Sequence, residues 1–448
     1  MDYAIFPPEE LIEDAVVEMP LSKSIANRAL VLAAMTDGAP RPKCPDCADT
    51  LMLAAALDTL AALRSDDPTP EIDLGINGTA MRFLTGFVAS RPGCRAVLTG
   101  PERMRQRPVG ALVTALRECG ADIEYLGEEG FPPLKIHGRK LAGGTVKVDA
   151  TVSSQFVSSL LMAAPLMTDG LTIELDGEPV SAPYIAMTLN MMDARGVPSD
   201  RSPLSVSVPP ARYTRPATDD AEGCWSTAAF FYEITALTAG WITLKGLKAD
   251  SLQGDRMAAD YFGRLGIVTA PSEECHGALD LQPSPEVYGR LDLDLTDTPD
   301  MAPALVASCC LTGVPFKFIG LQGLAIKECD RLSALVEEMD RIGCTVERIR
   351  DFGLEWEGKR HPITQVPVFD PHGDHRLAMA LAPTAVFIPG TVVRDAGCVD
   401  KSYPGYWEAL RSLGFTIREV ERHPSGEAEA AATQTTDSEE EAPEEVNR

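Results

Sequence analysis

The stretch Leu116–Tyr125, "LRECGADIEY", joins the end of an amphipathic helix to an extended segment through a glycine. Gly120 falls where a helix commonly closes on a residue in the left-handed conformation, which glycine adopts without steric cost. Four later stretches repeat this pattern, with gaps of 76, 70, 77 and 71 residues between successive glycines. These later glycines are Gly196, Gly266, Gly343 and Gly414. The spacing predicts repeated α+β units of about 70 residues.

An earlier stretch has the same character. Residues 53–74, "LAAALDTLAALRSDDPTPEIDL", read as a degenerate first copy without the glycine. Strand-like stretches such as "GLTIEL", "GWITLKGL" and "GTVVRDAG" lie between the predicted helices. The sequence therefore predicts an α/β fold of six α+β units.

The composition limits the class of protein. The chain has 448 residues, 45% hydrophobic and 24% charged, which is enough for two or three substantial cores. Its formal net charge of −26 argues against nucleic acid or an anionic membrane as a partner. No apolar run reaches the length of a membrane span, and the acidic start "MDYAIFPPEELIEDA" does not resemble a signal peptide. Eleven cysteines without an export signal favour reduced thiols, so we expect a cytoplasmic protein.

One cysteine pair, Cys44 and Cys47, has the spacing of metal ligands. A structural zinc ion would need a second pair, and the adjacent Cys309 and Cys310 lack that spacing. We therefore expect no metal in this protein.

Residues 425–448 differ in composition from the rest of the chain. They contain eight acidic residues against one arginine, no aromatic residue, and no aliphatic side chain larger than alanine except Val446. Such a segment cannot bury enough apolar surface to fold, so we predict a disordered acidic tail. The rest of the chain is still acidic, at about −19.

Positive charge is gathered in a few short stretches of this acidic chain. A lone lysine or arginine is ordinarily a solvated surface charge. Here each stretch adjoins small or hydroxyl-bearing residues and precedes an apolar helical run, and a helix start offers free N–H groups to an anion. The sequence therefore predicts anion-binding sites at these stretches, which are Lys23 with Arg28, Arg103 with Arg105 and Arg107, Lys327 with Arg331, Arg376, and Lys401.

Two neutral stretches fit the same interpretation, although ordinary helix capping explains either of them equally well. Gly78 and Thr79 begin an apolar helix that carries Arg82, and Gly78 lets an anion approach the backbone closely. The run Ser153–Gln155 offers hydroxyl and amide groups to a polyhydroxylated ligand.

Two carboxylates lie close to the cations in the sequence. Glu328 stands between Lys327 and Arg331, and Asp300 precedes an apolar run. Each is either a structural ion-pair partner or an acid or base beside an anionic substrate. The sequence leaves open whether His375 packs in the core or donates to a ligand.

Together these stretches resemble the EPSP synthase family, the 3-phosphoshikimate 1-carboxyvinyltransferases. The resemblance runs from about Val17 to Leu410. Its segments, in order, are "SKSIANRAL", "NGTAMR", "RMRQRPVGAL", "VSSQF", "VSAPYIAMTLNMM", "TPDMAP", "IKECDRL", "GDHRLAMA" and "KSYPGYWE".

The resemblance implies a fold and an activity. The expected fold has two lobes, each of three βαβαββ-type units, with residues 1–20 and 222–424 in one lobe and residues 21–221 in the other. The expected reaction transfers the enolpyruvyl group of phosphoenolpyruvate to the 5-hydroxyl of shikimate 3-phosphate and releases phosphate. This reaction belongs to the shikimate pathway, which leads to chorismate and the aromatic amino acids, and it is the target of glyphosate. We expect a monomer that needs no cofactor.

The resemblance also implies the binding residues. The shikimate 3-phosphate site would comprise Lys23, Ser24, Arg28, Ser153, Ser154, Gln155, Ser181, Tyr184, Asp300 and Lys327. The phosphoenolpyruvate site would comprise Lys23, Gly78, Arg107, Gln155, Arg331, Arg376 and Lys401. Arg28 would hold the carboxylate of shikimate 3-phosphate, and Lys23 would face both substrates.

Catalytic roles follow from the same resemblance. Asp300 would orient and deprotonate the attacking hydroxyl, and Glu328, with Lys23 nearby, would exchange the proton at the methylene carbon. The chain departs from the usual family pattern at five positions, where Leu21 replaces glycine, Ile76 replaces asparagine, Gly323 and Ala325 replace polar residues, and Cys224 replaces aspartate.

Two alternatives remain at this stage. The sister enzyme that acts on UDP-N-acetylglucosamine shares the fold, but it usually carries a cysteine in the loop that reads "TGPERMRQRP" here. A non-catalytic anion-binding protein on the same scaffold would explain Ile76, Gly323 and Cys224.

Overall fold

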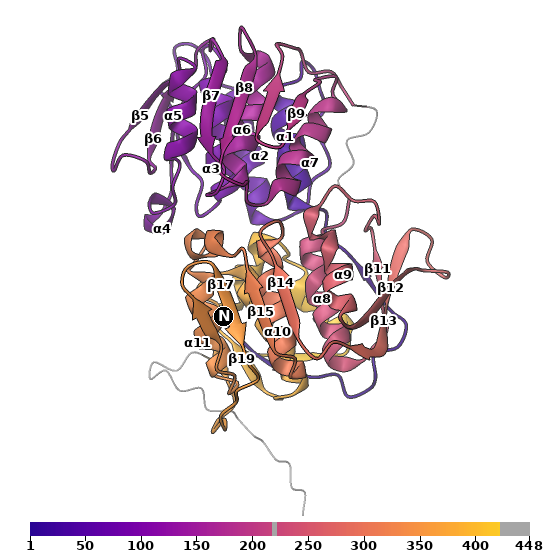
Figure 1. Ribbon diagram of the computed structural model, residues 1–448. Helices are drawn as coiled ribbons and strands as arrows, with labels where there is room; N and C mark the ends of the chain where they lie inside the picture. The colour runs from indigo at the N-terminus through magenta and orange to yellow at the C-terminus, as the bar shows by residue number, and fades with distance from the viewer. Residues whose placement is uncertain (217–221, 422–448) are drawn as a thin grey trace, which may run out of the picture.

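The molecule has two lobes, stacked one above the other in Figure 1. The computed structural model describes residues 1–216 and 222–421, so the predicted acidic tail lies outside the described residues. Buried apolar side chains form two core clusters. We call lobe 1 the part whose core spans residues 5–19 and 225–415, and lobe 2 the part whose core spans residues 25–213. The predicted α/β class and two-lobed layout are confirmed, whereas the residue boundaries of the domains stay predictions.

Lobe 1 contains three four-stranded sheets. In spatial order, the first is β18 (Val368–Phe369), β19 (Thr391–Val393), β1 (Asp2–Phe6) and β20 (Thr416–Val420). The second is β12 (Leu265–Pro271), β13 (Ala278–Val287), β11 (Ile242–Lys245) and β2 (Ala15–Glu18). The third is β14 (Leu291–Asp294), β15 (Phe316–Ile319), β17 (Gly353–Trp356) and β16 (Glu347–Ile349).

Lobe 2 contains two further four-stranded sheets within the described residues. One is β3 (Glu71–Asp73), β4 (Arg95–Thr99), β6 (Leu134–His137) and β5 (Asp122–Tyr125). The other is β7 (Gly144–Asp149), β8 (Leu171–Asp176), β10 (Ser205–Val208) and β9 (Asp200–Ser202).

All five sheets share one pairing pattern, a parallel pair at one edge followed by two antiparallel pairings. The repeated units predicted from the sequence therefore appear in the structure as sheets with the same pairing pattern. The degenerate first copy predicted at residues 53–74 ends in β3, which belongs to the sheet of β4, β6 and β5. The preceding helices, α1 (Lys23–Ala34) and α2 (Ala48–Ala61), have no sheet of their own within the described range 1–216. The six predicted α+β units thus correspond to five sheets among the residues that the structure describes.

Helices fill the interior of each lobe. In lobe 2 they are α1 (Lys23–Ala34), α2 (Ala48–Ala61), α3 (Gly78–Ala89), α4 (Glu102–Arg105), α5 (Gly110–Glu118), α6 (Ser154–Ala163) and α7 (Ala182–Asp193). In lobe 1 they are α8 (Trp225–Thr238), α9 (Ala258–Gly263), α10 (Ala302–Thr312), α11 (Arg331–Asp340), α12 (His375–Leu381) and α13 (Tyr406–Ser412). Helices α8, α10 and α12 pack against one another, as do α3, α6 and α7 in series. Because α8, α11 and α12 pack around α10, residues 302–310 of this helix are all buried. Each of them is apolar except Ser308.

The five glycines that led to the repeat all lie in the left-handed region. Gly120 has a φ of 96° and Gly414 a φ of 89°, directly after the last turns of α5 and α13. The other three have φ values between 77° and 86°. The predicted helix-closing position is confirmed for Gly120 and Gly414, whereas Gly266 lies inside β12, two residues past the cap of the preceding helix.

The chain crosses between the lobes twice, and the two crossings run side by side. Leu21 and Gly223 form an isolated antiparallel bridge. The Ser22 N–H donates to the Glu222 carbonyl oxygen at 2.7 Å, and the Cys224 N–H donates to the Pro20 carbonyl oxygen at 2.8 Å. Leu21, one of the departures from the family pattern, is therefore part of the strand pair that joins the lobes.

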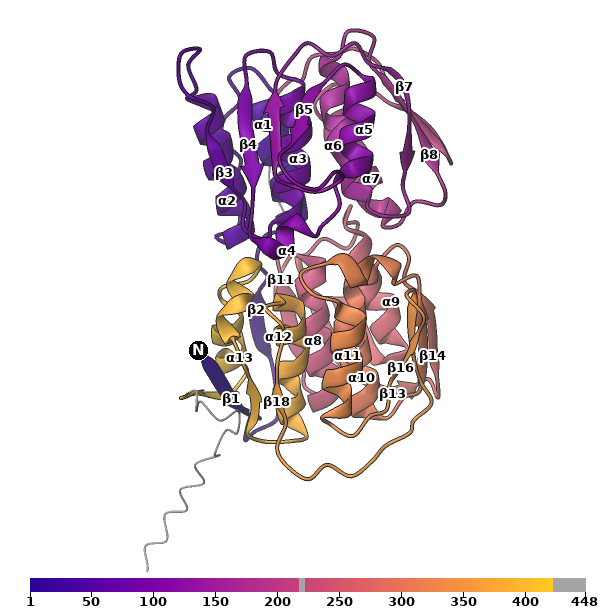
Figure 2. The same cartoon turned by 90° about the vertical axis from the view of Figure 1, so that its left-hand side faces the viewer.

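Both N-terminal strands belong to lobe 1, far from their sheet partners in sequence. Strand β1 pairs with β19 on one side and β20 on the other. Strand β2 pairs with β11, and both are labelled in Figure 2. None of the helices in residues 1–216 and 222–421 has the length and apolar character needed to cross a membrane.

One buried acid in lobe 1 makes stability depend on pH. Glu233 of α8 is fully buried, and neither carboxylate oxygen has a hydrogen-bond partner among the described residues. Burial raises the pKa of Glu233 well above 4.5, so the folded protein keeps this proton at pH values where the unfolded chain releases it. The contribution to stability is full below the unfolded pKa and is lost as pH rises toward the folded pKa.

Glu233→Gln should therefore raise the melting temperature at pH 8 by a few degrees while changing it little at pH 4. Thermal unfolding at both pH values measures this difference, and Glu118→Gln, on an exposed residue of the helix Gly110–Glu118, serves as the control. An equal change at the two pH values would show that Glu233 is ionised in the fold.

Candidate active site

A cleft between the lobes is lined by residues from both of them. Helices α1, α3 and α6 of lobe 2 and α11 of lobe 1 all begin at this cleft. Each of these helices is capped by the side chain of the residue just before it, and these residues are Ser22, Asn77, Ser153 and Asp330. Four positive helix ends therefore face the same space, which favours anions.

The charge of the cleft is opposite to that of the whole protein. Its lining holds eight lysine or arginine residues against three carboxylates, an excess of five positive charges in a chain of net charge −26. These residues are Lys23, Arg28, Arg82, Arg107, Lys327, Arg331, Arg376 and Lys401, with Asp49, Asp300 and Glu328. The local gathering of cations expected from the sequence is present.

Every residue that the sequence assigned to the two substrate sites lies on this cleft. The set comprises Lys23, Ser24, Arg28, Gly78, Arg107, Ser153, Ser154, Gln155, Ser181, Tyr184, Asp300, Lys327, Glu328, Arg331, Arg376 and Lys401. The structure thus brings together stretches up to almost 380 residues apart in sequence. The roles of the individual residues stay predictions.

A carboxylate that the sequence did not single out joins the two lobes inside the cleft. Asp49 of α2 lies 2.7 Å from the Lys23 Nζ and 2.7 Å from the Lys401 Nζ. Burial acts to lower the pKa of Lys23, but Asp49 outweighs burial and leaves this pKa above its usual value. Asp49 thus pairs with two cations, one from each lobe, and keeps Lys23 in its charged form. Asp49 lies in the first turn of α2, where acidic residues are common in any helix, so nothing in the local sequence marks it.

Arg331 is buried among three carboxylates. It lies 2.7 Å from Asp300, 3.0 Å from Glu328 and 2.7 Å from Asp374, which the sequence did not single out. Burial lowers the pKa of Arg331, but these carboxylates outweigh it and raise the pKa above the usual value. Arg331 therefore holds two carboxylates of the cleft, Asp300 and Glu328, in place through ion pairs.

The two predicted catalytic carboxylates are both ionised. Burial acts to raise the pKa of Asp300, but Arg376, Lys327 and Arg331 outweigh it and hold this pKa far below its usual value. Arg376 lies 3.2 Å from Asp300 and Lys327 lies 3.5 Å from it. The pKa of Glu328 is likewise well below 4.5, because its neighbouring cations, Arg331 first, outweigh burial. Asp300 or Glu328 must therefore take up a proton before it can give one to a substrate.

On the lobe 2 side of the cleft, the buried Arg82 holds the side-chain amide of Gln155 in place. Arg82 donates to the Gln155 Oε1 at 2.7 Å, and the Gln155 Nε2 donates to the Thr79 hydroxyl at 3.0 Å. Burial, together with the nearby Arg107, lowers the pKa of Arg82 to about 9. The structure thus adds Arg82 to the site as the residue that orients Gln155.

Gly78 is required by the close approach of two arginines. A Cβ at this position would lie 2.7 Å from the Arg107 Cζ and 2.7 Å from the Arg82 Nη1. Arg107 donates to the carbonyl oxygen of Ile76 at 2.7 Å. Because this contact uses the backbone, replacing the usual asparagine with Ile76 leaves the Arg107 anchor intact.

Arg28 is engaged by the protein in this structure. Its guanidinium donates to the Thr188 hydroxyl at 2.7 Å, the Ser24 carbonyl oxygen at 3.0 Å, and the Ser158 hydroxyl and Tyr184 carbonyl oxygen at 3.2 Å each. Burial lowers its pKa to about 10. The predicted grip on a substrate carboxylate therefore requires Arg28 to share or exchange one of these partners.

Tyr184 reaches across the cleft to a buried carboxylate of lobe 1. Its hydroxyl donates to the Asp255 Oδ2 at 3.1 Å, and the Ser226 hydroxyl donates to the same oxygen. Asp255 is fully buried, and its Oδ1 has no hydrogen-bond partner among the described residues. Cys224, where the family usually has aspartate, is the N-cap residue of α8, and the Tyr184 hydroxyl donates to Asp255 instead.

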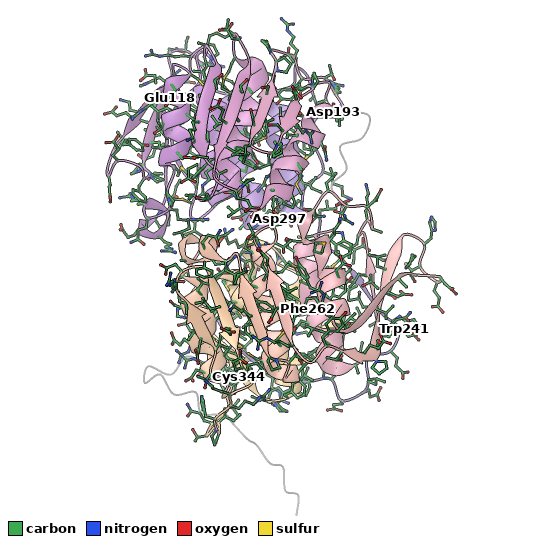
Figure 3. The ribbon with its side chains drawn as sticks, in the orientation of Figure 1. Glu118, Asp193, Trp241, Phe262, Asp297 and Cys344 are labelled. Atoms are coloured by element: carbon green, nitrogen blue, oxygen red, sulfur yellow. The ribbon has the colours of Figure 1, made fainter. Side chains whose placement is uncertain are left out.

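Further contacts hold the lobes together beside the cleft. Arg103 donates to the carbonyl oxygens of Lys327 at 2.8 Å and Glu328 at 3.1 Å. Asp297 lies where the lobes meet in Figure 3, and its Oδ1 accepts from the Ala182 N–H at 3.2 Å. Of the three arginines of "RMRQRP", only Arg107 lines the cleft among the described residues.

His375 lines the cleft as a neutral imidazole. Burial, then the positive charge of Lys23, holds its pKa well below 6.5. Neither ring nitrogen has a hydrogen-bond partner among the described residues. Of the two interpretations left open by the sequence, this geometry favours a donor to a ligand over a packing role.

The fold and the cleft define a class of protein, a two-lobed α/β protein that gathers small anions between its lobes. The EPSP synthase (3-phosphoshikimate 1-carboxyvinyltransferase) family model matches residues 12–410, so the chain belongs to this family.

Individual relatives agree with this assignment. The chain is 42% identical over 422 residues to a 3-phosphoshikimate 1-carboxyvinyltransferase of Bacteroides fragilis, covering 93% of this chain and 99% of the relative. It is 34% identical to one from Vibrio atlanticus, covering 89% of this chain and 96% of the relative. A solved EPSP synthase structure from Acinetobacter baumannii has a TM-score of 0.72 and 20% identity, covering 93% of this chain and 100% of that chain, and supports the fold.

Proposed function

We propose that the protein transfers the enolpyruvyl group of phosphoenolpyruvate to the 5-hydroxyl of shikimate 3-phosphate and releases phosphate. The reaction would place it in the shikimate pathway toward chorismate. The observation that carries the proposal is the excess of five positive charges in one cleft of an acidic protein. Two substrates that bring several negative charges into one space need such a neutralising environment.

The two substrates would occupy neighbouring parts of the cleft. Arg28, Ser154 and Tyr184 lie on the lobe 2 side, where shikimate 3-phosphate would bind. Arg107, Arg376 and Lys401 come from both lobes and would hold phosphoenolpyruvate between them. Lys23 is paired with Asp49 between these groups and would face both substrates.

The carboxylates would move the protons. Asp300, kept ionised by Arg376 and Lys327, would orient the 5-hydroxyl and accept its proton. Glu328 would deliver a proton to the methylene carbon and later recover one. Because bound phosphate and carboxylate groups offset the cations that depress the pKa of Glu328, substrate binding would raise this pKa and let Glu328 take up a proton.

A coupled assay of phosphate release tests the proposed function. Phosphate should appear when phosphoenolpyruvate and shikimate 3-phosphate are both present, and not when either is omitted. Release with UDP-N-acetylglucosamine as the acceptor instead would identify the sister activity. No release with either acceptor would leave a non-catalytic anion-binding protein. The monomeric state and the cytoplasmic location stay predictions from sequence.

Asp255→Asn is expected to raise the KM for shikimate 3-phosphate about tenfold, with kcat changed less than about threefold. The substitution replaces the carboxyl group that accepts from the Tyr184 hydroxyl with an amide, which has one acceptor oxygen in place of two oxygens, so Tyr184 is held less firmly against the substrate. Steady-state kinetics with each substrate varied in turn measures the split between KM and kcat. Asp260→Asn, on an exposed residue of α9, is the matched control. An unchanged KM for shikimate 3-phosphate would refute the positioning role of Asp255.

A further inference from the structure

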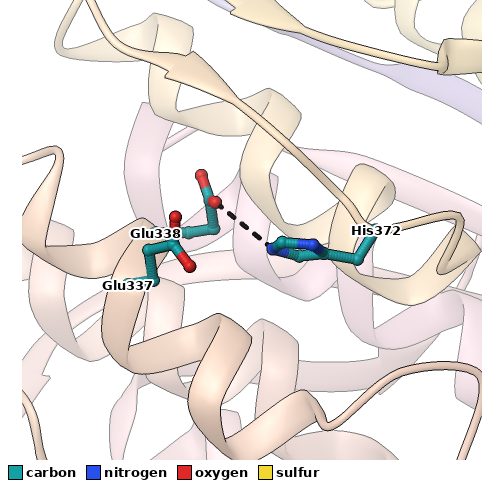
Figure 4. Close-up of side chains that lie close together, drawn as sticks. All are labelled: Glu337, Glu338 and His372. Atoms are coloured by element: carbon teal, nitrogen blue, oxygen red, sulfur yellow. Dashed lines mark ion pairs between the residues drawn. The ribbon is translucent and has the colours of Figure 1, made fainter.

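A cluster of potential metal ligands lies outside the cleft, where α11 ends. Glu337 and Glu338 stand in the last turn of α11, and His372 lies in the loop between β18 and α12 (Figure 4). One ligand atom from each residue can be chosen so that all three lie within 4.8 Å of one another. The loop approaches the helix with its imidazole directed at the carboxylates.

A buried oxygen in this cluster has no hydrogen-bond partner among the described residues. Glu338 is 0% exposed, and its Oε2 accepts from the Arg341 Nε at 2.9 Å and from the Asp370 N–H at 3.2 Å. Its Oε1 has no hydrogen-bond partner among the described residues and points toward His372. Leaving a buried carboxylate oxygen unpaired costs free energy, which a bound cation would recover.

The distance from this oxygen to the imidazole is that of two ligands of one ion. The Glu338 Oε1 and the His372 Nε2 are 3.7 Å apart, too far for a hydrogen bond. A tetrahedral zinc ion with ligands at about 2.0–2.2 Å would set neighbouring ligand atoms about 3.4 Å apart. We propose that Glu337, Glu338 and His372 form a binding site for a divalent transition-metal ion such as zinc, with water as the fourth ligand.

The surrounding charges suit a divalent cation. Arg341 lies 2.7 Å from the Glu337 Oε1 and 2.9 Å from the Glu338 Oε2, which leaves one oxygen of each carboxylate for the metal. Hydrogen bonds of this kind orient ligating carboxylates. Burial raises the pKa of Glu338 to about 7, and once Glu338 is ionised the two carboxylates and Arg341 carry a net charge of −1. The side chains of Glu337 and His372 are 56% and 35% exposed, so an ion can enter from solvent.

The ion would link helix α11 to the loop that carries His372, and both of these segments lead into the cleft. Helix α11 begins at Arg331, and the loop that carries His372 continues directly into Asp374 and His375. Metal binding should therefore stabilise the folded protein by mass action. The proposal does not depend on the proposed enzymatic activity, because none of its three ligands lines the cleft.

Zinc titration of the full chain, stripped of metal and kept reduced, tests the proposal. A chromophoric chelator in competition reports the zinc bound, and we expect one equivalent in the unmodified chain. His372→Ala and Glu338→Gln should each weaken binding at least tenfold, whereas His361→Ala, on a comparably exposed histidine paired with Asp340, should not. Zinc should also raise the melting temperature of the unmodified chain and not that of His372→Ala.

Two outcomes overturn the proposal. Zinc binding that survives His372→Ala would place the metal elsewhere in the chain, and cobalt substitution that shows thiolate charge-transfer absorption would place it on one of the eleven cysteines. No bound zinc at a roughly 100-fold excess over protein would show that Glu338 and His372 contact each other without a metal. Circular dichroism of the Glu338→Gln protein separates loss of a ligand from loss of fold, and His372→Ala supplies the test if that protein does not fold.

Discussion

Glu328→Gln is expected to lower kcat about 10²–10⁴-fold, while the dissociation constant of shikimate 3-phosphate stays within about threefold. Glutamine keeps the size and the acceptor oxygen of the side chain, but it cannot gain and lose a proton. The contact of Glu328 with Arg331 at 3.0 Å weakens without leaving a hole in the structure. Turnover by phosphate release and ligand affinity by calorimetry measure the two quantities separately.

The same variant also tests the protonation sequence. If anionic substrates raise the pKa of Glu328, their binding should draw protons from the buffer, and calorimetry in buffers of different ionisation enthalpy measures this uptake. The uptake should shrink in Glu328→Gln and persist in Glu347→Gln, a surface control paired with Lys359. Near-normal turnover of Glu328→Gln would rule out the proton-transfer role.

Lys23→Met is expected to reduce kcat/KM for phosphoenolpyruvate by between about 30- and 1,000-fold, the effect of removing one partner from a buried charge pair. Lys23 stands 2.7 Å from Asp49, and its loss leaves Asp49 paired with Lys401 alone. The cleft would then lose a cation and gain a partly unpaired carboxylate. Both changes oppose a negatively charged substrate.

Steady-state kinetics with phosphoenolpyruvate varied at saturating shikimate 3-phosphate measures this loss. Lys43→Met removes the same charge from an exposed position 20 residues away and is the matched control. Asp49→Asn combined with Lys23→Met should recover part of the loss, because it removes the unpaired carboxylate. If Lys23→Met falls no further than Lys43→Met, Lys23 has no contact with the substrates in the transition state.

Local features of the fold could be predicted because short stretches of chain determine them. A left-handed glycine after an amphipathic helix, such as Gly120, needs only its neighbours to adopt its conformation. The same holds for the capping of α1 by Ser22 and the start of α3 at Gly78. The expectation that scattered cations meet in one cleft followed from their shared position before apolar helices and from the resemblance to a family.

Partners that come from distant parts of the chain could not be predicted in this way. Asp49 and Lys401 are 352 residues apart, and nothing near Asp49 marks it as a counter-ion. Asp255 likewise acquires its meaning only when Tyr184 of the other lobe reaches it. The sheet count differs for a related reason, because a helix pair such as α1 and α2 can pack on its neighbours without completing a sheet.

The placement of β1 and β2 has a consequence for biosynthesis. These strands leave the ribosome well before their partners, and β1 must wait for β19 and β20, which are made nearly 400 residues later. During this interval the nascent chain can complete the intervening lobe, whose core lies within residues 25–213. Strand β1 is therefore made long before it can find its place, and until then it must be kept from pairing with the wrong edge.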